Sequence, residues 1–336
     1  MVAARPVGLA EPMKLLVLGG TEFVGRALVE EGLARGWEVT TFNRGNHAAD
    51  PRVEAIVGDR RAGLDRLDPR VWDVVADTWS WEPSTVRDSA RFIHTDRYVY
   101  ISSRSVYTWP RPPGSTEDSP TVEASADEES HDDYARAKRG AELAVLDAFG
   151  DRAVLARAGL ILGPRENIGR LPYWLTRIAR GGDVLAPGPA DQTFQYVDAR
   201  DLAAFALSVQ PGAYNIVSEP GVTTLGELLS IATEVTGGTG TLHWADPASL
   251  IAAGVEPWMD LPIWLPAGED HETMHEADVS RAMAAGLSIR PLRETVADTW
   301  AWLRSIGGVA PQRPDRPVLG LDAARERELI TALIPI

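Results

Sequence analysis

The stretch KLLVLGGTEFVG, residues 14–25, combines three features that decide the fold. Residues 14–18 form a short, mainly apolar run, which is typical of a strand buried on both faces of a sheet. A glycine-rich turn follows directly, and apolar residues then recur at helical spacing until Gly36. A strand, a tight turn and a helix in this order predict the first unit of a parallel α/β sheet.

Strands and helices continue to alternate beyond this unit. We expect further strands over residues 39–42, 53–57, 71–76, 97–102 and 153–162, and crossover helices over 84–94 and 132–148. This alternation predicts an α/β fold with a doubly wound parallel sheet over residues 13–165. Residues 1–12 are expected to be an irregular leader, and the Pro-, Ser- and acid-rich residues 110–130 a surface loop.

After residue 165 the pattern becomes less regular. It predicts helices over residues 171–180, 224–236 and 292–303, strands over 213–217 and 239–244, and a loop over 245–270. We assign residues 166–310 to a smaller α+β substrate-binding part that also returns elements to the first domain. Residues 311–336 are expected to be a C-terminal tail with a short helix.

The composition excludes several classes of protein. The 336 residues carry 33 Lys and Arg against 48 Asp and Glu, and the net charge of −15 argues against nucleic acid as a partner. We find neither an apolar run of the ~18–20 residues that span a membrane nor a secretory signal. The absence of cysteine excludes disulfides and thiolate metal sites. We therefore expect a cytoplasmic protein that acts on a small molecule, and a homodimer is left open.

The glycine turn is a candidate phosphate site because it joins the first strand to the first helix. Backbone amides and the helix dipole at such a turn can hold a pyrophosphate. Gly19 permits the tight turn and Gly25 allows the helix to approach the sheet. We assign the intervening Thr21, Glu22, Phe23 and Val24 to the same site, although an ordinary connection between strand and helix is the alternative.

The end of the second strand bears on cofactor choice. Asn43 and Arg44 stand where an acidic residue would accept hydrogen bonds from the 2′-hydroxyl of the ribose. A guanidinium there suits a 2′-phosphate, which favours NADP(H), with NAD(H) as the alternative. Asp59 and Arg60 follow the third strand and are assigned to the adenine side of the site. Arg44 as a solvated side chain and Asp59 as a turn cap are the other interpretations.

A tyrosine and a lysine define the candidate catalytic site. Tyr134 and Lys138 are four residues apart and therefore share one face of the predicted helix. An ammonium group beside a phenol lowers the phenol's pKa and makes it a usable general acid and base. Ser103 ends the preceding strand, where doubly wound sheets place their ligands, and could hold the same substrate oxygen.

With these motifs the chain resembles the extended short-chain dehydrogenase/reductases, the NAD(P)-dependent epimerase/dehydratase family, in an atypical form. The resemblance covers residues 14 to about 305 and includes SSRSVY (102–107), YARAK (134–138), LARAGLILGP (155–164) and QYVDARDLA (195–203). It implies a Rossmann domain in which Tyr134 donates the proton, Ser103 hydrogen-bonds the substrate and Lys138 binds the nicotinamide ribose. We assign to the cofactor site also Asp77, Thr78, Ser102 and Gly159, and to the substrate wall Trp79, Trp109 and Asn167.

Two positions depart from the family pattern. Glu22 replaces the middle glycine of the turn, and a carboxylate near a pyrophosphate is repulsive unless it points away. Phe194 and Gln195 lie roughly where sugar-nucleotide enzymes carry a diphosphate-binding arginine, and we find no counterpart of that arginine. The second departure makes a sugar-nucleotide substrate less secure.

The HETMH motif at residues 271–275 matches the zinc pattern H-E-x-x-H, with Glu294 downstream as a third ligand. Because a polar loop is predicted directly before it, we interpret it as a chance match and predict no metal.

The sequence as a whole predicts an NADPH-dependent oxidoreductase that reduces a carbonyl of a sugar or of a small molecule resembling a secondary metabolite, with Tyr134 as proton donor. The alternatives are a nucleotide-sugar epimerase or dehydratase with a recycled cofactor and, more remotely, a non-catalytic NADP-binding regulator.

Overall fold

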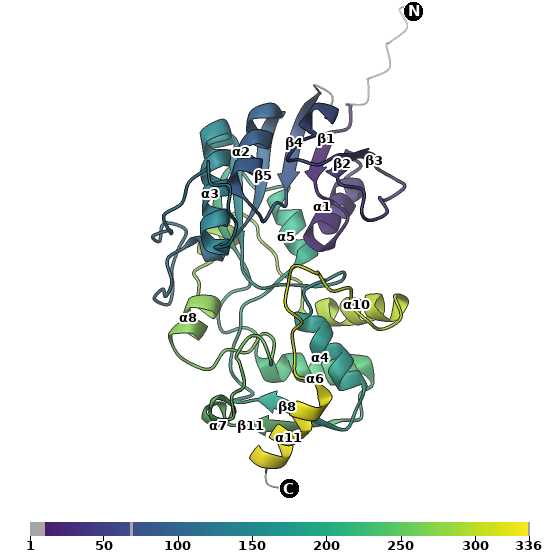
Figure 1. Ribbon diagram of the computed structural model, residues 1–336, viewed down its shortest axis with the longest axis vertical. Helices are drawn as coiled ribbons and strands as arrows, with labels where there is room; N and C mark the ends of the chain where they lie inside the picture. Colours follow the sequence, from purple (N-terminus) through teal and green to yellow (C-terminus); the bar gives the residue numbers. More distant parts are fainter. Residues whose placement is uncertain (1–10, 68–69, 335–336) are drawn as a thin grey trace, which may run out of the picture.

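Seven parallel strands form one sheet in the upper half of the molecule (Figure 1). The computed structural model describes residues 11–67 and 70–334, so most of the predicted leader lies outside the described residues. In spatial order the strands are β10 (Gly212–Ile216), β6 (Ala153–Ala158), β5 (His94–Ser103), β4 (Val71–Asp77), β1 (Lys14–Leu18), β2 (Glu38–Asn43) and β3 (Glu54–Val57). This order, with every pair parallel, confirms the doubly wound α/β fold.

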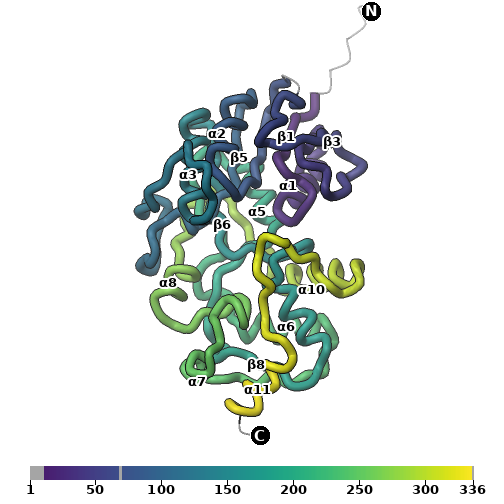
Figure 2. The backbone as a smooth tube through the Cα atoms, in the orientation of Figure 1, coloured from purple at the N-terminus to yellow at the C-terminus, as the bar shows by residue number. Residues whose placement is uncertain are grey.

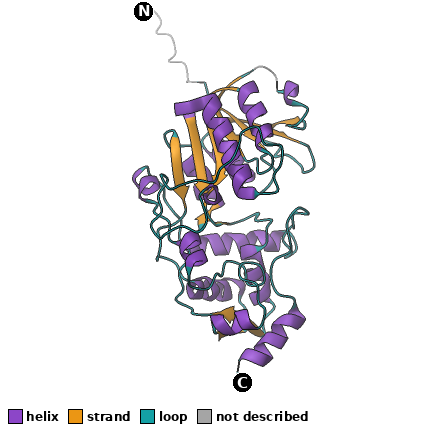
Figure 3. Ribbon diagram, turned by 60° about the vertical axis from the view of Figure 1, so that its left-hand side comes forward, coloured by secondary structure: helices purple, strands orange, loops and turns teal. Residues whose placement is uncertain are grey.

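Helices cover both faces of this sheet (Figure 3). One face packs against α1 (Phe23–Ala34) and α5 (Ala199–Ala206), and the other against α2 (Pro83–Phe92) and α3 (Tyr134–Phe149). Successive residues of β1 point to opposite faces of the sheet. Leu15 and Val17 pack on the side of α1 and α5, whereas Leu16 and Leu18 pack on the side of α2 and α3. Burial on both faces explains why this strand is apolar at successive positions.

The lower half holds a second core around Trp174. Its helices are α4 (Arg170–Ala179), α6 (Leu225–Thr236), α7 (Pro247–Ala252), α8 (Glu269–His275) and α10 (Leu292–Ser305). They accompany a two-stranded parallel sheet of β8 (Asp183–Pro187) and β11 (Thr241–Ala245). The short helix α9 (Ser280–Ala284) instead returns to the upper half, where Ala282 joins the core beneath α1 and α5.

Several sequence-based boundaries differ from the structure. The strand expected over 153–162 ends at Ala158, and β7 (Ile161–Leu162) pairs separately with β9 (Val197–Asp198). Gly159 follows the last residue of β6 at a point where the Val217 side chain approaches the backbone closely. A Cβ on Gly159 would lie 2.3 Å from Val217 Cγ1. The 245–270 loop contains α7, which Asp246 caps by accepting a hydrogen bond from the Ser249 amide at 2.9 Å.

Residues 110–130 carry no helix or strand, as expected, but the segment is not only a surface loop. Arg111 and Glu117 are buried, and the Glu117 carboxylate accepts a hydrogen bond from the Asn215 amide at 2.8 Å. This contact ties the loop to the edge strand β10. None of the helices within the described residues is long and apolar enough to cross a bilayer.

The C-terminal segment crosses the boundary between the two halves (Figure 2). From α10 the chain rises to the lower end of the upper half and then descends to α11 (Ala323–Leu333), which packs on β8. Glu326 of α11 is buried, and its carboxylate binds Arg177 at 2.5 Å and the Leu185 amide at 3.1 Å. The predicted tail helix is therefore part of the lower core.

Candidate cofactor and active site

The glycine turn has the geometry of an anion site. Gly19 and Gly20 have φ angles of +118° and +92°, and a Cβ on Gly25 would lie 2.7 Å from the Gly20 nitrogen. Within the described part of the chain no side chain caps α1, so the amides of its first turn are available to a phosphate. Phe23 is buried in the core and Val24 packs against it, so these two residues can offer the site only their backbone.

Neighbouring side chains hold the turn in place. Asn43 donates to the Gly19 carbonyl at 3.3 Å and accepts from the Gly45 amide at 2.9 Å, so its side chain joins β2 to the turn. The Thr78 hydroxyl donates to the Leu18 carbonyl at 3.0 Å. These contacts give Asn43 and Thr78 a role in shaping the turn, in addition to any contact with a ligand.

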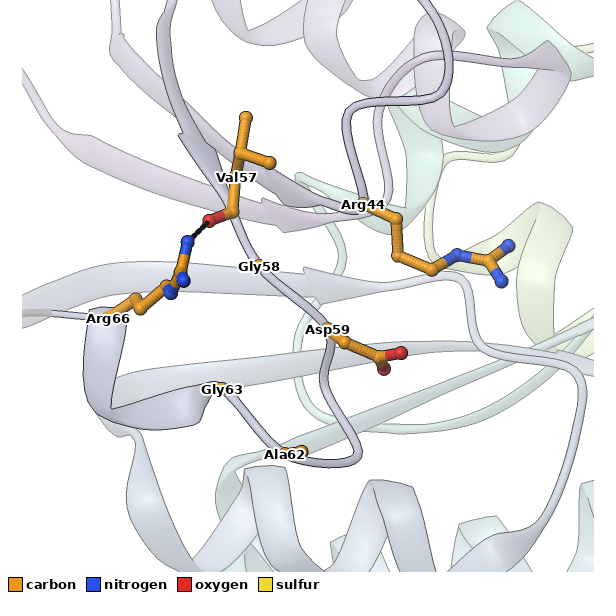
Figure 4. Close-up of a pocket in the computed structure, with 7 residues that line it drawn as sticks. All are labelled: Arg44, Val57, Gly58, Asp59, Ala62, Gly63 and Arg66. Atoms are coloured by element: carbon orange, nitrogen blue, oxygen red, sulfur yellow. Dashed lines mark hydrogen bonds between the residues drawn. The ribbon is translucent and has the colours of Figure 1, made fainter.

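A cavity of about 390 Å³ lies beyond the ends of β2 and β3, lined by Arg44, Val57, Gly58, Asp59, Ala62, Gly63 and Arg66 (Figure 4). The Arg44 and Asp59 side chains point to the same side of it. Asp59 also caps a turn, as one interpretation of the sequence proposed, by accepting from the Arg61 amide at 3.0 Å. Arg44 is exposed, and within the described residues no hydrogen bond or ion pair engages its guanidinium. Sequence reasoning missed Arg66, which donates to the Val57 carbonyl at 2.9 Å.

Arg60 and Asp77 form a buried ion pair and do not line an open site. The two guanidinium–carboxylate distances are 2.5 and 2.8 Å, and the Tyr98 hydroxyl adds a third hydrogen bond to the carboxylate at 2.7 Å. Burial raises the pKa of Asp77, but the Arg60 charge and these hydrogen bonds outweigh it and hold the pKa below its usual value. We assigned both side chains to the cofactor site. In the structure their polar groups bind each other, and the Asp77 carboxylate also accepts the hydrogen bond from Tyr98 of β5.

Lys138 is the most constrained of the candidate catalytic groups. Its ammonium is 2 % exposed and donates to the backbone oxygens of Trp79 at 2.7 Å and Ile101 at 2.8 Å, where β4 and β5 end. Burial lowers the pKa of Lys138 to about 7 against the opposing effect of the Asp77 and Glu142 carboxylates. Since an ammonium has three donors, one remains for a ligand.

Tyr134 begins α3, one helical turn before Lys138, and is 36 % exposed. Asp133 caps this helix by accepting from the Arg136 amide at 3.0 Å. Ser103 ends β5, and its hydroxyl lies 3.1 Å from that of Ser105. The fold thus brings the serine, the tyrosine and the lysine to the carboxyl end of the sheet, where α3 packs against β5.

The side chain of Ser102 faces away from this site. Its hydroxyl donates to Glu142 at 2.7 Å, and Glu142 is in turn bound by Arg157 at 2.8 and 2.9 Å. All three residues are buried. Ser102 and Gly159, which we assigned to the cofactor site, therefore have packing roles evident in the structure.

The three residues assigned to the substrate wall make contacts in different parts of the structure. The guanidinium carbons of Arg60 and Arg61 lie 5.0 and 5.2 Å from the centre of the Trp79 ring, and the Trp79 carbonyl accepts a hydrogen bond from Lys138. Trp109 is 46 % exposed and donates to Asp270 at 2.7 Å. Asn167 is buried and donates to Glu22 at 3.1 Å, so it contacts the glycine turn.

The two histidines of the HETMH motif lie on α8 and are buried, contrary to the polar setting that we inferred for them. His271 Nε2 lies 2.8 Å from the Thr193 carbonyl, and His275 Nδ1 accepts from the Gln195 amide at 3.2 Å. Nowhere in residues 11–67 and 70–334 do three or more potential His, Asp or Glu ligands gather around a metal position. These histidines attach α8 to the 193–195 segment.

Sequence reasoning missed Arg316, which lies beside Tyr134, and Arg170, which begins α4. The Arg316 guanidinium carbon lies 5.5 Å from the centre of the Tyr134 ring, and Arg170 stacks on Trp258 at 5.2 Å. Burial lowers the pKa of Arg170; the charge of Glu166 opposes this change and the charge of Arg316 adds to it. No local pattern could have identified Arg316, because it belongs to the C-terminal segment.

Comparison with known proteins agrees with this geometry. Residues 83–216 match the profile of the family described as the NAD dependent epimerase/dehydratase family. A search of curated proteins finds no significant match. Among solved structures, UDP-glucose 4-epimerase from Thermus thermophilus, in complex with NAD, is similar at 21 % identity and a TM-score of 0.59, covering 88 % of this chain and 100 % of that one.

Two further solved structures show the same fold. UDP-glucuronic acid 4-epimerase from Bacillus cereus, in complex with NAD, has 16 % identity, a TM-score of 0.63 and coverage of 88 % of this chain and 99 % of that one. The epimerase Mth375 from Methanothermobacter thermautotrophicus has 16 % identity, a TM-score of 0.65 and coverage of 88 % and 93 %. The profile match and the shared fold confirm the resemblance of this chain to the extended short-chain dehydrogenase/reductases of the NAD(P)-dependent epimerase/dehydratase family.

Proposed function

We propose that this protein is an enzyme of the epimerase/dehydratase type that uses a nicotinamide dinucleotide and acts on a hydroxyl-bearing carbon of a small molecule. The observation that carries the proposal is the position of Lys138, buried at the ends of β4 and β5 one turn below Tyr134. A purely structural role does not call for a buried ammonium group with a pKa near 7 at this edge of the sheet.

The residues of the turn and the pocket fit a dinucleotide. The uncapped amides of α1 suit a pyrophosphate, and the cavity at Arg44 and Asp59 suits the adenosine end. When bound, the nicotinamide would accept and return a hydride. Tyr134 takes the proton from the substrate hydroxyl and later returns it, Ser103 holds the same oxygen, and Lys138 offers its third N–H to the ribose.

The similar structures favour a recycled cofactor over a net reduction. Those from T. thermophilus and B. cereus are epimerases in complex with NAD, and in an epimerisation the hydride returns to the same substrate molecule. The second candidate is an NADPH-dependent carbonyl reductase. It is favoured by Arg44, whose guanidinium at the cavity suits a 2′-phosphate.

The deciding experiment measures which cofactor the protein carries and binds. The purified protein is denatured, the released nucleotide is identified by mass spectrometry, and the protein is titrated with NADH and NADPH by nicotinamide fluorescence. Retained NAD⁺ and turnover of UDP-glucose or UDP-glucuronic acid without added cofactor would support the epimerase. NADPH binding that weakens about tenfold or more in Arg44→Gln, but not in the exposed Arg91→Gln, would support the reductase. Binding of neither dinucleotide would overturn both.

A further inference from the structure

The C-terminal segment passes beside the candidate site at the boundary of the two halves. Between α10 and α11, residues 311–320 rise from the lower half to the lower end of the upper half and then return (Figure 2). Ala310 before them and Leu321 after them both belong to the lower core, so the two ends of this excursion are fixed. We call residues 311–320 the strap.

The strap reaches from the neighbourhood of the glycine turn to the candidate catalytic tyrosine. The Arg313 amide donates to the Asn167 carbonyl at 3.3 Å, and the Asn167 side chain donates to Glu22 of the turn at 3.1 Å. Three residues further along the strap, the Arg316 guanidinium carbon lies 5.5 Å from the centre of the Tyr134 ring, within the range of a cation–π contact. The strap therefore spans the interval between the expected pyrophosphate site and the expected place of the nicotinamide.

The backbone of the strap is restricted. Every third residue is a proline, at positions Pro311, Pro314 and Pro317. Because the proline ring fixes φ, a segment with this spacing has few conformations to lose when it docks. The restriction favours movement of the strap as one unit over local unravelling.

The tip of the strap is a preformed turn. The Arg316 amide donates to the Arg313 carbonyl at 3.2 Å, and Pro314 occupies the second position of the turn, where proline is favoured. The Asp315 carboxylate binds the Arg313 guanidinium at 3.0 and 2.5 Å and forms a longer ion pair with the Arg316 Nε at 3.8 Å. Since these contacts lie within the tip, its shape does not depend on its resting against Tyr134.

Few contacts hold the strap against the rest of the protein. Among the described residues, the bond from the Arg313 amide is the one backbone hydrogen bond that joins residues 311–319 to the remainder of the chain. Its length of 3.3 Å exceeds the usual range of about 2.7–3.2 Å. The side chains of Arg316 and Val318 are exposed, whereas α10 and α11 on either side bury several side chains in the lower core. The strap can therefore move without disturbing that core.

We propose that the strap is a gate that controls the entry and exit of the dinucleotide. In the structure it is closed, since it lies between the neighbourhood of the glycine turn and Tyr134, and it must move away for the dinucleotide to pass. The inference rests on the proposed function in taking these two places as parts of the dinucleotide site, and it adds that the strap slows cofactor exchange. Slow exchange suits a reaction in which the hydride returns to the substrate, because the cofactor then need not leave between turnovers.

A gate has a kinetic signature that an ordinary binding contact lacks. Both entry and exit require the open strap, so a substitution that favours the open strap raises the association and release rate constants by the same factor. The Kd, which is their ratio, then changes little. Loss of a direct contact with the dinucleotide instead raises the release rate constant alone and raises Kd with it.

The test is stopped-flow fluorescence of NADH and NADPH with the full chain. Association is followed at increasing dinucleotide concentration, and release by displacement with excess NAD⁺ or NADP⁺. The variants are Arg316→Gln, which removes the contact with Tyr134, and Pro314→Gly, which loosens the tip. The matched controls are Arg304→Gln, at an exposed arginine in the last turn of α10, and Pro220→Gly, at an exposed proline in the loop before α6.

The gate predicts that Arg316→Gln and Pro314→Gly each raise both rate constants about two- to fivefold, the scale of one exposed cation–π contact or one restricted backbone position. The Kd should stay within about twofold of the wild-type value, the melting temperatures should be unchanged, and both controls should match wild type. Faster release alone, or rate constants equal to those of the controls, would overturn the gate and leave the dinucleotide site in place. Binding of neither dinucleotide by wild type would overturn the proposed function and the gate together.

Discussion

The Asn167 side-chain amide donates to the Glu22 carboxylate at 3.1 Å and so joins the glycine turn to the segment that leads into α4. Glu22 stands where the family pattern has a glycine, and its side chain is 46 % exposed. The carboxylate therefore points toward Asn167 and His47, the latter at 3.5 Å. This orientation explains how the turn accommodates an acidic residue.

Glu22→Gln should strengthen dinucleotide binding. The substitution removes a negative charge near the expected pyrophosphate but keeps an oxygen that can accept from Asn167. We expect Kd to fall about two- to fivefold at low salt, with a smaller change at high salt because the charge is partly exposed. Nicotinamide fluorescence measures it, and Glu38→Gln, at the far end of β2, is the control. Weaker binding in Glu22→Gln would mean that the carboxylate itself helps to hold the cofactor.

Tyr134→Phe should abolish most of the turnover without preventing cofactor binding. Removal of a positioned proton donor typically costs about 10²–10⁴-fold in rate, whereas Lys138 remains to contact the ribose. The measurements are kcat on any accepted substrate and the Kd of the dinucleotide, which should change less than about threefold. Tyr214→Phe, in the edge strand β10, controls for the loss of a phenol oxygen. More than a tenth of the wild-type kcat in Tyr134→Phe would rule out the assigned role.

Lys138 should give the protein a distinctive dependence of stability on pH. Burial lowers its pKa from 10.5 to about 7, so between these values the unfolded chain binds more protons than the folded one. The contribution of Lys138 to the free energy of unfolding therefore rises with pH from about 7 to about 10.5. Below about pH 7 the folded protein holds this side chain buried in its charged form, so the cost of burying the charge is fully present.

The Lys138→Met variant lacks this linkage. The free energy of unfolding in urea should therefore rise for wild type relative to the variant between pH 7 and pH 9.5. From the shift in pKa we expect this relative gain to be of the order of a few kcal/mol. The absolute difference at one pH also contains the loss of the hydrogen bonds to Trp79 and Ile101, so only the pH dependence is diagnostic. Parallel curves for the two proteins would show that the lysine keeps an ordinary pKa.

Asp77→Asn should destabilise the fold strongly. It leaves the Arg60 guanidinium buried and without its counter-charge, which typically costs about 3–5 kcal/mol. The matched comparison is Glu234→Gln, which breaks the exposed ion pair with Arg293 and should cost less than about 1 kcal/mol. Urea unfolding measures both. Similar small losses in the two variants would indicate that Asp77 is not bound as the structure has it.

The buried charges also show what the sequence leaves open about a site residue. Asp77 and Arg60 were assigned to the cofactor because they follow strands at the edge where ligands bind. Position along a strand does not tell which way a side chain points or which partner it finds, and the structure pairs these two side chains with each other. Ser102 shows the same limit, since its hydroxyl turns to Glu142 on α3.

The sequence by itself determined the parallel sheet, the glycine turn and the pairing of Tyr134 with Lys138 on one helix face. These features follow from the periodicity of apolar residues and from the conformations open to glycine, and both act over a few residues. Only the tertiary structure decided that Arg316 lies over Tyr134 and that Asn167 reaches Glu22. Such contacts join segments that are far apart in the chain. The Arg316 contact arises because α10 and α11 both pack in the lower core, which fixes the path of the segment that connects these two helices.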